Sequence, residues 1–395
     1  MKPELKKAWQ IGLLTISAYL ANYYLRNMLG VLTPEMLSAG VTTKNLAGLL
    51  SSTYMLTYAV GQLFNGVLGD IFNPKYMASI GLAAAGLASI AFPFLGGTVP
   101  QLLCFAVMGY ALSMMRGPLV KIISENTQAA YARTICVFFS FASFAGPLLA
   151  GFFAMLFAWN RAFVAAGIVA LLLAVAAYLI LTVMERRGTI CFHSVRGQGL
   201  KGILEVFKIE KFAFYMLIAC LVEISAIAIY FWIPTYLNES LGFSETAANG
   251  IFSAISTLRS FMPFFVLWLY RVMKERDVLM MRFSFALATV FFLLMLIANT
   301  PWLTIAMMGL ALLCISVSSA LLWSIYIPSL GKTGRVSSVN GILDCSGYAA
   351  ASLANLAFAR VITTLSWNGV IVLWSGIGLI GLLGSLCVKT NKKAS

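Results

Sequence analysis

Residues 61–76 read GQLFNGVLGDIFNPKY, and they hold the clearest architectural signal in the chain. The stretch starts inside an apolar segment long enough to cross a bilayer and ends in a short basic turn at Asn73-Pro74-Lys75. A comparable stretch, FFVLWLYRVMKERD, closes another long apolar segment at residues 264–277. Two such turns, each joining a pair of apolar segments, indicate a membrane chain built from two similar halves.

The composition points to the same class of protein. Of the 395 residues, 61% are hydrophobic and only 10% are charged, and the mean hydropathy is +0.92. A soluble domain carries roughly 25% charged residues. Apolar runs of about 20 residues, the length that a membrane-spanning helix needs, recur along the whole chain. We therefore expect an all-α membrane protein that lies in a lipid bilayer and has no sizeable soluble domain.

The apolar runs predict twelve transmembrane helices, six on each side of a basic central loop. The predicted spans are residues 8–36, 45–69, 75–96, 100–127, 132–158, 161–184, 212–239, 245–270, 278–299, 301–328, 334–363 and 367–388. This pattern divides the chain into an N-terminal six-helix bundle at 1–184, a cytoplasmic basic linker at 185–211 and a C-terminal six-helix bundle at 212–395.

The basic residues predict the orientation. If the N-terminus lies inside, the loops on the outer side hold only Lys44 and Arg161, and all other loop lysines and arginines face the cytoplasm. Cytoplasmic loops of membrane proteins carry this excess. Both termini are thus expected in the cytoplasm, at the plasma (inner) membrane. Topology also accounts for the net charge of +14, so no nucleic-acid partner is expected.

Enzyme and metal chemistry have no support in the sequence. The seven cysteines are scattered without a CxxC pair, and His193 is the one histidine. This pattern indicates neither a disulfide framework nor a metal site. The chain has no HExxH motif, nucleophile elbow or nucleotide-binding loop. We expect no enzymatic activity, no metal and no cofactor.

Five charged side chains lie near the middle of predicted spans: Arg26, Arg116, Glu223, Arg259 and Asp344. A charge at membrane depth costs several kcal/mol unless it faces a polar cavity or a partner. A chain that keeps five such charges is expected to move a polar or charged solute.

Arg26 and Arg116 are the candidate anion-binding residues. Tyr23 precedes Arg26 by one helical turn, so the two share a face. A guanidinium beside a phenol suits the paired oxygens of a carboxylate or phosphate. Arg116 lies roughly 23 Å along its helix, slightly past the midplane. The alternatives are structural: Arg26 is locked to Glu223 or Asp344, and Arg116 bonds backbone carbonyls.

Glu223 and Asp344 are the candidates for proton coupling. A carboxyl group at membrane depth can bind and release a proton, because burial and nearby cations shift its pKa in opposite directions. Glu223 is also a candidate to hold a substrate amine. Tyr230 is added to the substrate-binding candidates as an aromatic that lines the cavity.

Lys121 and Arg259 are expected to have structural or gating roles. Lys121 precedes Glu125 by four positions, which predicts a local ion pair at the cytoplasmic end of the fourth span. Arg259 is expected to pair with Asp344 or with Glu223. Breaking such a pair would leave a costly lone charge.

The stretch from Gly66 to Lys75 resembles the major facilitator signature G-x-x-x-D-R-x-x-x-[KR]. The resemblance implies that Asp70 and Lys75 clamp helix ends on the cytoplasmic side and gate the inward opening. The chain departs from the signature at Ile71, where an arginine is usual. This family folds as two pseudo-symmetric six-helix bundles.

Within that fold, the ending Asn-Pro-Lys is similar to the organophosphate:phosphate antiporter family, the glycerol-3-phosphate and hexose-phosphate transporters and their relatives. Residues 19–27 (YLANYYLRN), 232–237 (WIPTYL), 347–348 (GY) and 366–369 (SWNG) also resemble that family. The resemblance implies that Arg26 binds phosphate. The family's second arginine, on the seventh helix, corresponds to Ala226 here, and a lysine often found in the second helix corresponds to Gln62.

Together these features predict a monomeric secondary active transporter of a small polar organic anion or zwitterion, such as an organic phosphate or carboxylate. It would work by alternating access, coupled to protons or to exchange for a counter-anion. Two alternatives remain open at this point: a multidrug-type efflux pump, and a membrane sensor of a phosphorylated metabolite.

Overall fold

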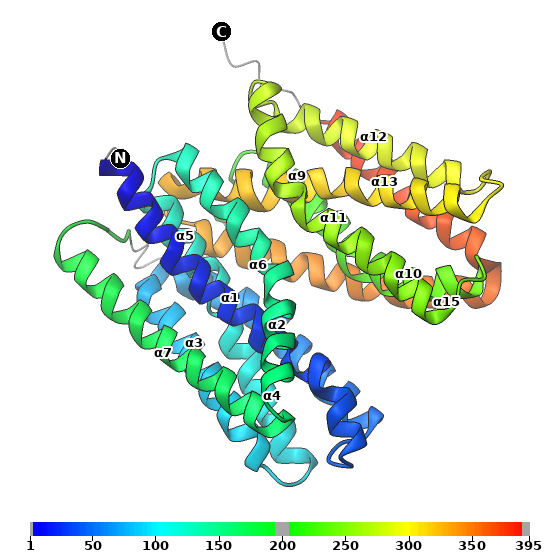
Figure 1. Cartoon of the computed structure of the whole chain (residues 1–395). Coiled ribbons are helices and arrows are strands. Elements are labelled where there is room, and N and C mark those ends of the chain that lie inside the picture. Colours follow the sequence, from blue (N-terminus) through cyan, green and yellow to red (C-terminus); the bar gives the residue numbers. More distant parts are fainter. Residues whose placement is uncertain (1–2, 194–204, 389–395) are drawn as a thin grey trace. The chain divides into compact units, whose positions relative to one another are not determined.

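The computed structural model describes residues 3–193 and 205–388 (Figure 1). Over these ranges the chain is helical with short connections and contains no strand. The helices of the first half are α1 (Pro3–Ser38), α2 (Lys44–Ile71), α3 (Pro74–Ala91), α4 (Thr98–Ser113), α5 (Arg116–Asn126), α6 (Ala129–Leu156) and α7 (Trp159–Arg186). Those of the second half are α9 (Phe212–Glu223), α10 (Tyr230–Glu239), α11 (Glu245–Val272), α12 (Asp277–Met295), α13 (Pro301–Ala320), α14 (Ile327–Ser329) and α15 (Val336–Leu386).

Short polar side chains begin the helices at predictable places. Thr43 accepts a hydrogen bond from the Leu46 amide at the start of α2, and Ser244 accepts one from the Ala247 amide at the start of α11. Asn73 caps α3, whose first residue is Pro74. These residues accept hydrogen bonds from amides that have no partner within the helix. Proline is tolerated at the first position because the N–H that it lacks would have no partner within the helix. α2 in the first half and α11 in the second half therefore begin with the same kind of hydroxyl cap.

Several predicted spans are interrupted near their middle. The fourth span is divided between α4 and α5 at Met114 and Met115. The seventh and tenth contain π-helical turns at Ile224–Ile229 and Leu321–Tyr326. A π turn inserts one extra residue and often marks a functional site. The predicted eleventh and twelfth spans are two helices within the range of α15, separated by a kink at Ser366, where φ is 67°.

Nine helical segments of the described ranges are long and apolar enough to cross a membrane. The number is ten if the bent pair Ala129–Ser143 and Ala145–Leu156 counts as one span. The predicted first and second spans, α1 and α2, are helical but fall outside this set. Both bury polar side chains instead of presenting an apolar surface all round, such as Asn22 and Asn65, each 1% exposed.

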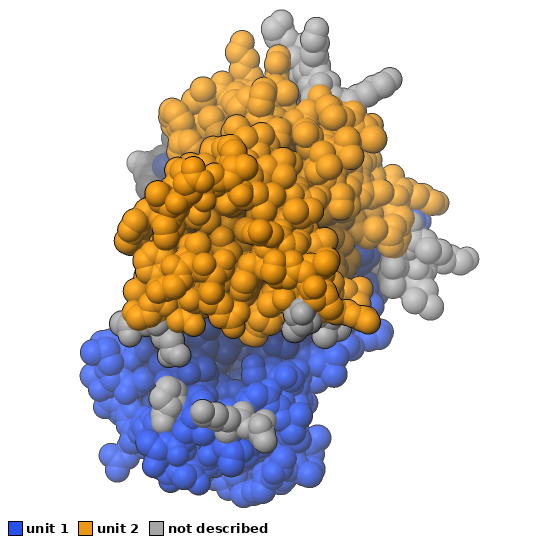
Figure 2. Space-filling view, turned by 90° about the vertical axis from the view of Figure 1, so that its right-hand side faces the viewer, with its two compact units in different colours: residues 1–206, 327–345 blue, residues 207–326, 346–395 orange. Residues whose placement is uncertain are grey.

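The chain forms two compact units, coloured separately in Figure 2. Unit 1 comprises residues 1–206 and 327–345, and unit 2 comprises residues 207–326 and 346–395. The segment Ile327–Cys345 belongs to the second half of the sequence but packs within unit 1. Part of the predicted linker at 185–211, residues 194–204, lies outside the described residues. The predicted division of the chain at that linker stays a prediction.

Candidate functional site

Arg26 lies in the middle of α1 between two phenol rings. Its guanidinium carbon is 5.2 Å from the ring centre of Tyr58 on α2 and 5.8 Å from that of Tyr23 on its own helix. One terminal nitrogen lies 3.6 Å from the Met55 sulfur. Aromatic faces attract a guanidinium, more strongly where water is excluded. Both rings thus contact the guanidinium of Arg26, which is half-buried.

Arg116 and Asp344 form a buried ion pair in unit 1. The Arg116 Nη1 atom lies 2.6 Å from one carboxylate oxygen of Asp344, and the other oxygen accepts a hydrogen bond from Asn340 at 3.0 Å. The Asp344 side chain is 1% exposed and that of Arg116 is 17% exposed. Sequence analysis offered Arg259 as a partner of Asp344. The structure assigns that place to Arg116, which belongs to the same compact unit.

The two arginines share one group of phenols. The charge of Arg116 interacts with Tyr19, Tyr23 and Tyr58, and the last two also flank Arg26. Tyr19 is buried, stacks on Phe139 and meets the edge of the Tyr23 ring. A phenol donates one hydrogen bond and accepts others, so the cluster can serve an anionic oxygen. Tyr19 and Tyr58 were not among the predicted site residues.

The break in the fourth span explains how Arg116 reaches this cluster. α4 ends at Ser113, and Arg116 is the first residue of α5. Its neighbour Gly117 lies so close to Ser337 that a Cβ atom there would come within 2.4 Å of the Ser337 hydroxyl oxygen. The first turn of α5 therefore packs tightly against the start of α15. Asp344 lies further along the same helix.

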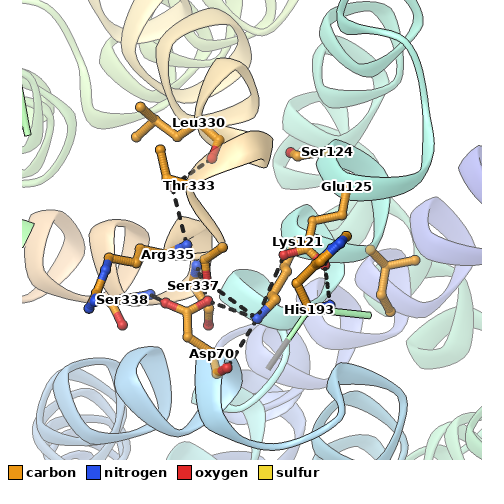
Figure 3. A network of polar contacts seen from close by, with 12 residues as sticks. Asp70, Lys121, Ser124, Glu125, His193, Leu330, Thr333, Arg335, Ser337 and Ser338 are labelled. Carbon is orange, nitrogen blue, oxygen red and sulfur yellow. Dashed lines mark hydrogen bonds and ion pairs between the residues drawn. The ribbon is translucent and has the colours of Figure 1, made fainter. Parts of the chain in front are cut away.

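Asp70 and Lys121 join α2, α5 and the start of α15 (Figure 3). The Asp70 carboxylate accepts hydrogen bonds from the amides of Ser337 at 3.1 Å and Ser338 at 2.7 Å. Those amides belong to the first turn of a helix, where a negative charge is favourable. Lys121 is fully buried and lies 3.3 Å from the same carboxylate and 3.7 Å from Glu125. We name Asp70, Lys121, Ser337 and Ser338 the clasp.

Glycines allow the backbones at the clasp to approach closely. A Cβ atom on Gly341 of α15 would come within 2.3 Å of the Gln62 carbonyl oxygen and 2.7 Å of the Gly66 Cα atom. Both are backbone atoms that cannot rotate away. Gln62 thus lies at a helix contact and is 1% exposed.

Lys75, the other residue of the signature, forms a separate contact on unit 1. It makes a short ion pair with Glu185 at the end of α7, and its ammonium group lies 4.9 Å from the Tyr76 ring centre. Asn73 also donates to Glu185 at 3.0 Å. Lys75 therefore ties the α2–α3 turn to α7. Glu185 lies 110 residues away in the sequence and was not predicted.

Three predicted site residues belong to unit 2. Arg259 of α11 donates through Nε to the Ser316 hydroxyl at 3.0 Å, and its guanidinium lies 4.5 Å from the ring centre of Tyr230. Glu223 ends α9, directly before the first π turn. Its side chain packs over Gly347 of α15, where a Cβ atom would come within 2.5 Å of the Glu223 Cγ atom.

Across residues 3–193 and 205–388, no three His, Cys, Asp or Glu side chains are grouped so as to hold a metal ion. What the structure brings together instead is cationic guanidinium groups, phenols and hydroxyls inside helical bundles. Guanidinium groups and hydroxyls can donate charge-assisted or neutral hydrogen bonds to an anion.

The helical bundles and their intramembrane charges define a membrane transport protein, and sequence comparison agrees. Residues 15–354 match the family model described as Major Facilitator Superfamily. The chain belongs to this superfamily, a family of transport proteins and not of enzymes. The predicted fold, twelve transmembrane helices in two pseudo-symmetric bundles, is the fold of that superfamily.

The curated relatives include a membrane sensor protein and probable hexose phosphate transport proteins. The chain is 26% identical over 257 residues to the membrane sensor protein UhpC of Salmonella typhimurium, covering 58% of this chain and 57% of the relative. It is 30% identical over 87 residues to a probable hexose phosphate transport protein of Chlamydia trachomatis, covering 22% of this chain and 19% of the relative. The matched region thus covers 57% of the length of the first relative and 19% of the length of the second.

Solved structures agree on the fold. The fucose transporter FucP in its outward conformation has a TM-score of 0.73 at 13% identity, with 96% of this chain and 99% of that chain covered. A bacterial homologue of the iron transporter ferroportin, in an outward-facing state, has a TM-score of 0.76 at 13% identity, with 95% and 98% covered. At this identity the likeness concerns the fold alone.

Proposed function

We propose that this protein is a secondary transporter of a small polar organic anion or zwitterion. One observation carries the proposal: Arg26 and Arg116, both at membrane depth in unit 1, share the phenols of Tyr23 and Tyr58. Two guanidinium groups that act on the same tyrosines suit an oxyanion. The sugar-phosphate relatives support an organic phosphate or a similar anion as the solute.

Replacing Arg26 by glutamine is expected to weaken anion binding. Loss of a charge-assisted hydrogen bond costs roughly 1.5 to 3 kcal/mol, or about ten- to a hundredfold in affinity. The measurement is a thermal-shift titration of purified protein with organic phosphates, carboxylates, sulfonates and amino acids, since a ligand of the folded state raises its apparent stability.

Arg186→Gln, at the exposed cytoplasmic end of α7, is the matched control and should bind as the wild type does. A wild-type protein that responds only to lipophilic cations, with Arg26→Gln unchanged, would favour a multidrug-type efflux pump and contradict the anion proposal.

We place the coupling proton on Glu223 in preference to Asp344. Both oxygens of Asp344 are already bound, one to Arg116 and the other to Asn340. Glu223 lies beside a π turn, where the helix geometry is irregular, and against Gly347 of a neighbouring helix. A carboxyl group at such a joint can gain or lose a proton as the helices move. Exchange for a counter-anion is the competing mode of energy coupling.

Glu223→Gln is expected to abolish the response of transport to a pH gradient. Because glutamine cannot titrate, uptake of the identified anion into proteoliposomes should proceed at the same rate with and without an imposed gradient. Asp344→Asn, which is neutral at the other carboxyl and keeps Arg116, is the comparison for Asp344. Proton coupling at both carboxyl groups is wrong if both proteins keep the wild-type rate and pH dependence. Faster uptake against internal phosphate, whatever the gradient, would indicate exchange.

A sensor is the second candidate, because a UhpC-type sensor is among the relatives. A sensor binds its solute without moving it. Tight anion binding together with no uptake by proteoliposomes, under any gradient or internal anion, would support it.

The location proposed for the protein is the inner membrane, as a monomer with both termini in the cytoplasm. The distribution of loop lysines and arginines supports this orientation.

A further inference from the structure

We propose that unit 2 carries a second oxyanion-binding site, built from Arg259, Tyr230 and Ser256, which receives a phosphate, sulfonate or carboxylate group of the transported solute. This inference rests on the proposed function and adds a residue to it. Sequence analysis assigned Arg259 to a structural ion pair. The structure pairs Asp344 with Arg116, and no ion pair joins Arg259 to Glu223 among the described residues, so the reason for the structural assignment is removed.

Arg259 is held in place by neutral groups. Its Nε atom donates to Ser316 of α13, whose hydroxyl in turn donates to the Leu312 carbonyl. The ring of Tyr230 supports the guanidinium from α10 at 4.5 Å. In the described part of the chain, the two terminal nitrogens of Arg259 make no hydrogen bond and no ion pair. A fixed fork with its two ends open is the arrangement that binds an oxyanion through parallel hydrogen bonds.

Two hydroxyls of the same region are enclosed but unsatisfied. The Tyr230 hydroxyl and the Ser256 hydroxyl are each buried without a hydrogen-bond partner among the described residues. Ser256 precedes Arg259 by three positions on α11, so the two side chains lie on one face. Buried hydroxyls are almost always hydrogen-bonded, because leaving one without a partner costs its full desolvation penalty. A bound oxyanion would accept from both hydroxyls and from the guanidinium.

Unit 1 contains a similar pair, an arginine against a tyrosine ring, with the two residues on the opposite helices. α2 and α11 are both 28 residues long, and both begin with a hydroxyl cap, Thr43 and Ser244. Tyr58 lies fourteen positions after the first residue of α2, and Arg259 lies fourteen positions after the first residue of α11. In unit 1 the arginine comes from the first helix of the pair and the tyrosine from the second. In unit 2 the order is reversed.

The seventh span carries no arginine, whereas the eighth carries Arg259 beside a tyrosine of the seventh. The intramembrane arginine of unit 2 therefore lies on the eighth span. An arginine stacked on a phenol favours planar or tetrahedral oxyanions over a neutral sugar ring or an ammonium group.

The test compares anion binding by variants of the full-length protein. Phosphate, methanesulfonate and acetate are titrated as probes, one for each class of oxyanion, with thermal shift and calorimetry as readouts. Arg259→Gln should lose roughly ten- to a hundredfold in affinity for the best probe, the effect of removing a charge-assisted hydrogen bond. Tyr230→Phe keeps the ring and removes the hydroxyl, and should lose about two- to tenfold.

Thr257→Val is the matched control. Its residue adjoins Ser256 but is exposed, and its hydroxyl bonds only the Ser253 carbonyl, so affinity should not change. Arg259→Lys keeps the charge and should fall between the wild type and Arg259→Gln. This order separates anion binding from a purely structural role.

The outcomes distinguish this inference from the proposed function. Wild-type protein that binds none of the three probes contradicts both. Binding that depends on Arg26 but is unchanged in a folded Arg259→Gln protein overturns the second site alone. If Arg259→Gln does not fold, equal affinities for wild type, Arg259→Lys and Tyr230→Phe overturn it in the same way.

Discussion

Replacing Asp344 by alanine is expected to destabilise the protein by about 3 to 5 kcal/mol. The cause is the charge left behind: Arg116 would remain buried with its partner carboxylate removed, although the pair lies at 2.6 Å in the wild type. Asn340 would also lose the oxygen to which it donates. Arg116→Ala is expected to have a similar effect, because it strands a carboxylate whose side chain is 1% exposed.

The double variant Arg116→Gln/Asp344→Asn is expected to recover most of this loss. Removing both charges leaves no uncompensated ion, and a buried pair contributes little net stability over neutral groups of similar size. Thermal and denaturant unfolding are measured on the detergent-purified wild type, the two single variants and the double variant. These four proteins form a double-mutant cycle. Arg161→Gln, at an exposed position, controls for loss of one positive charge and should change stability by less than about 0.5 kcal/mol. Additive single effects would contradict a pair.

The same pair marks the limit of what the sequence predicts. That Arg116 and Asp344 lie at membrane depth follows from counting along each helix. That they meet does not follow, because they are 228 residues apart and several arginines compete for one carboxylate. The choice depends on helix rotations and on the break at Met114 and Met115, which no local pattern announces.

Features of the fold that have a local cause in the sequence were easier to predict. The caps at Thr43 and Ser244 and the turn Asn73-Pro74 begin helices in the structure within one or two residues of the predicted positions. Asp70 was predicted to clamp helix ends from the signature that surrounds it. Its partners, the amides of Ser337 and Ser338, are backbone groups, and no side-chain pattern identifies them.

Unit 2 shows why the sequence alone did not determine the roles of the intramembrane charges. Arg259 was assigned to a structural pair because an unpaired cation at this depth is costly. Two neutral neighbours hold it instead, a serine hydroxyl and a phenol ring. Neither residue type distinguishes a binding site from ordinary packing in a sequence, since serines and aromatic residues are common in these helices.

Asp70→Ala is expected to release the start of α15 from the clasp. The carboxylate is the acceptor for the Ser337 and Ser338 amides and lies 3.3 Å from Lys121, which is itself fully buried. Its loss leaves two amides and an ammonium group with fewer acceptors, at a cost of about 3 to 5 kcal/mol. Since α15 also carries Asp344, the effect should extend to the ion pair with Arg116.

Amide hydrogen exchange by mass spectrometry measures this directly, because local opening exposes the first-turn amides of α15. Peptides covering residues 336–345 should exchange roughly ten- to a hundredfold faster in Asp70→Ala than in the wild type, while peptides of α12 stay unchanged. Asp70→Asn keeps one carbonyl acceptor and should lie between the two. Lys121→Met alone should also speed exchange, because Asp70 and Glu125 then face each other without a cation. Combining it with Asp70→Asn should restore part of the protection, since one of those two charges is gone. Wild-type exchange in Asp70→Ala would mean that glycine packing at Gly66 and Gly341 holds the helices together without the clasp.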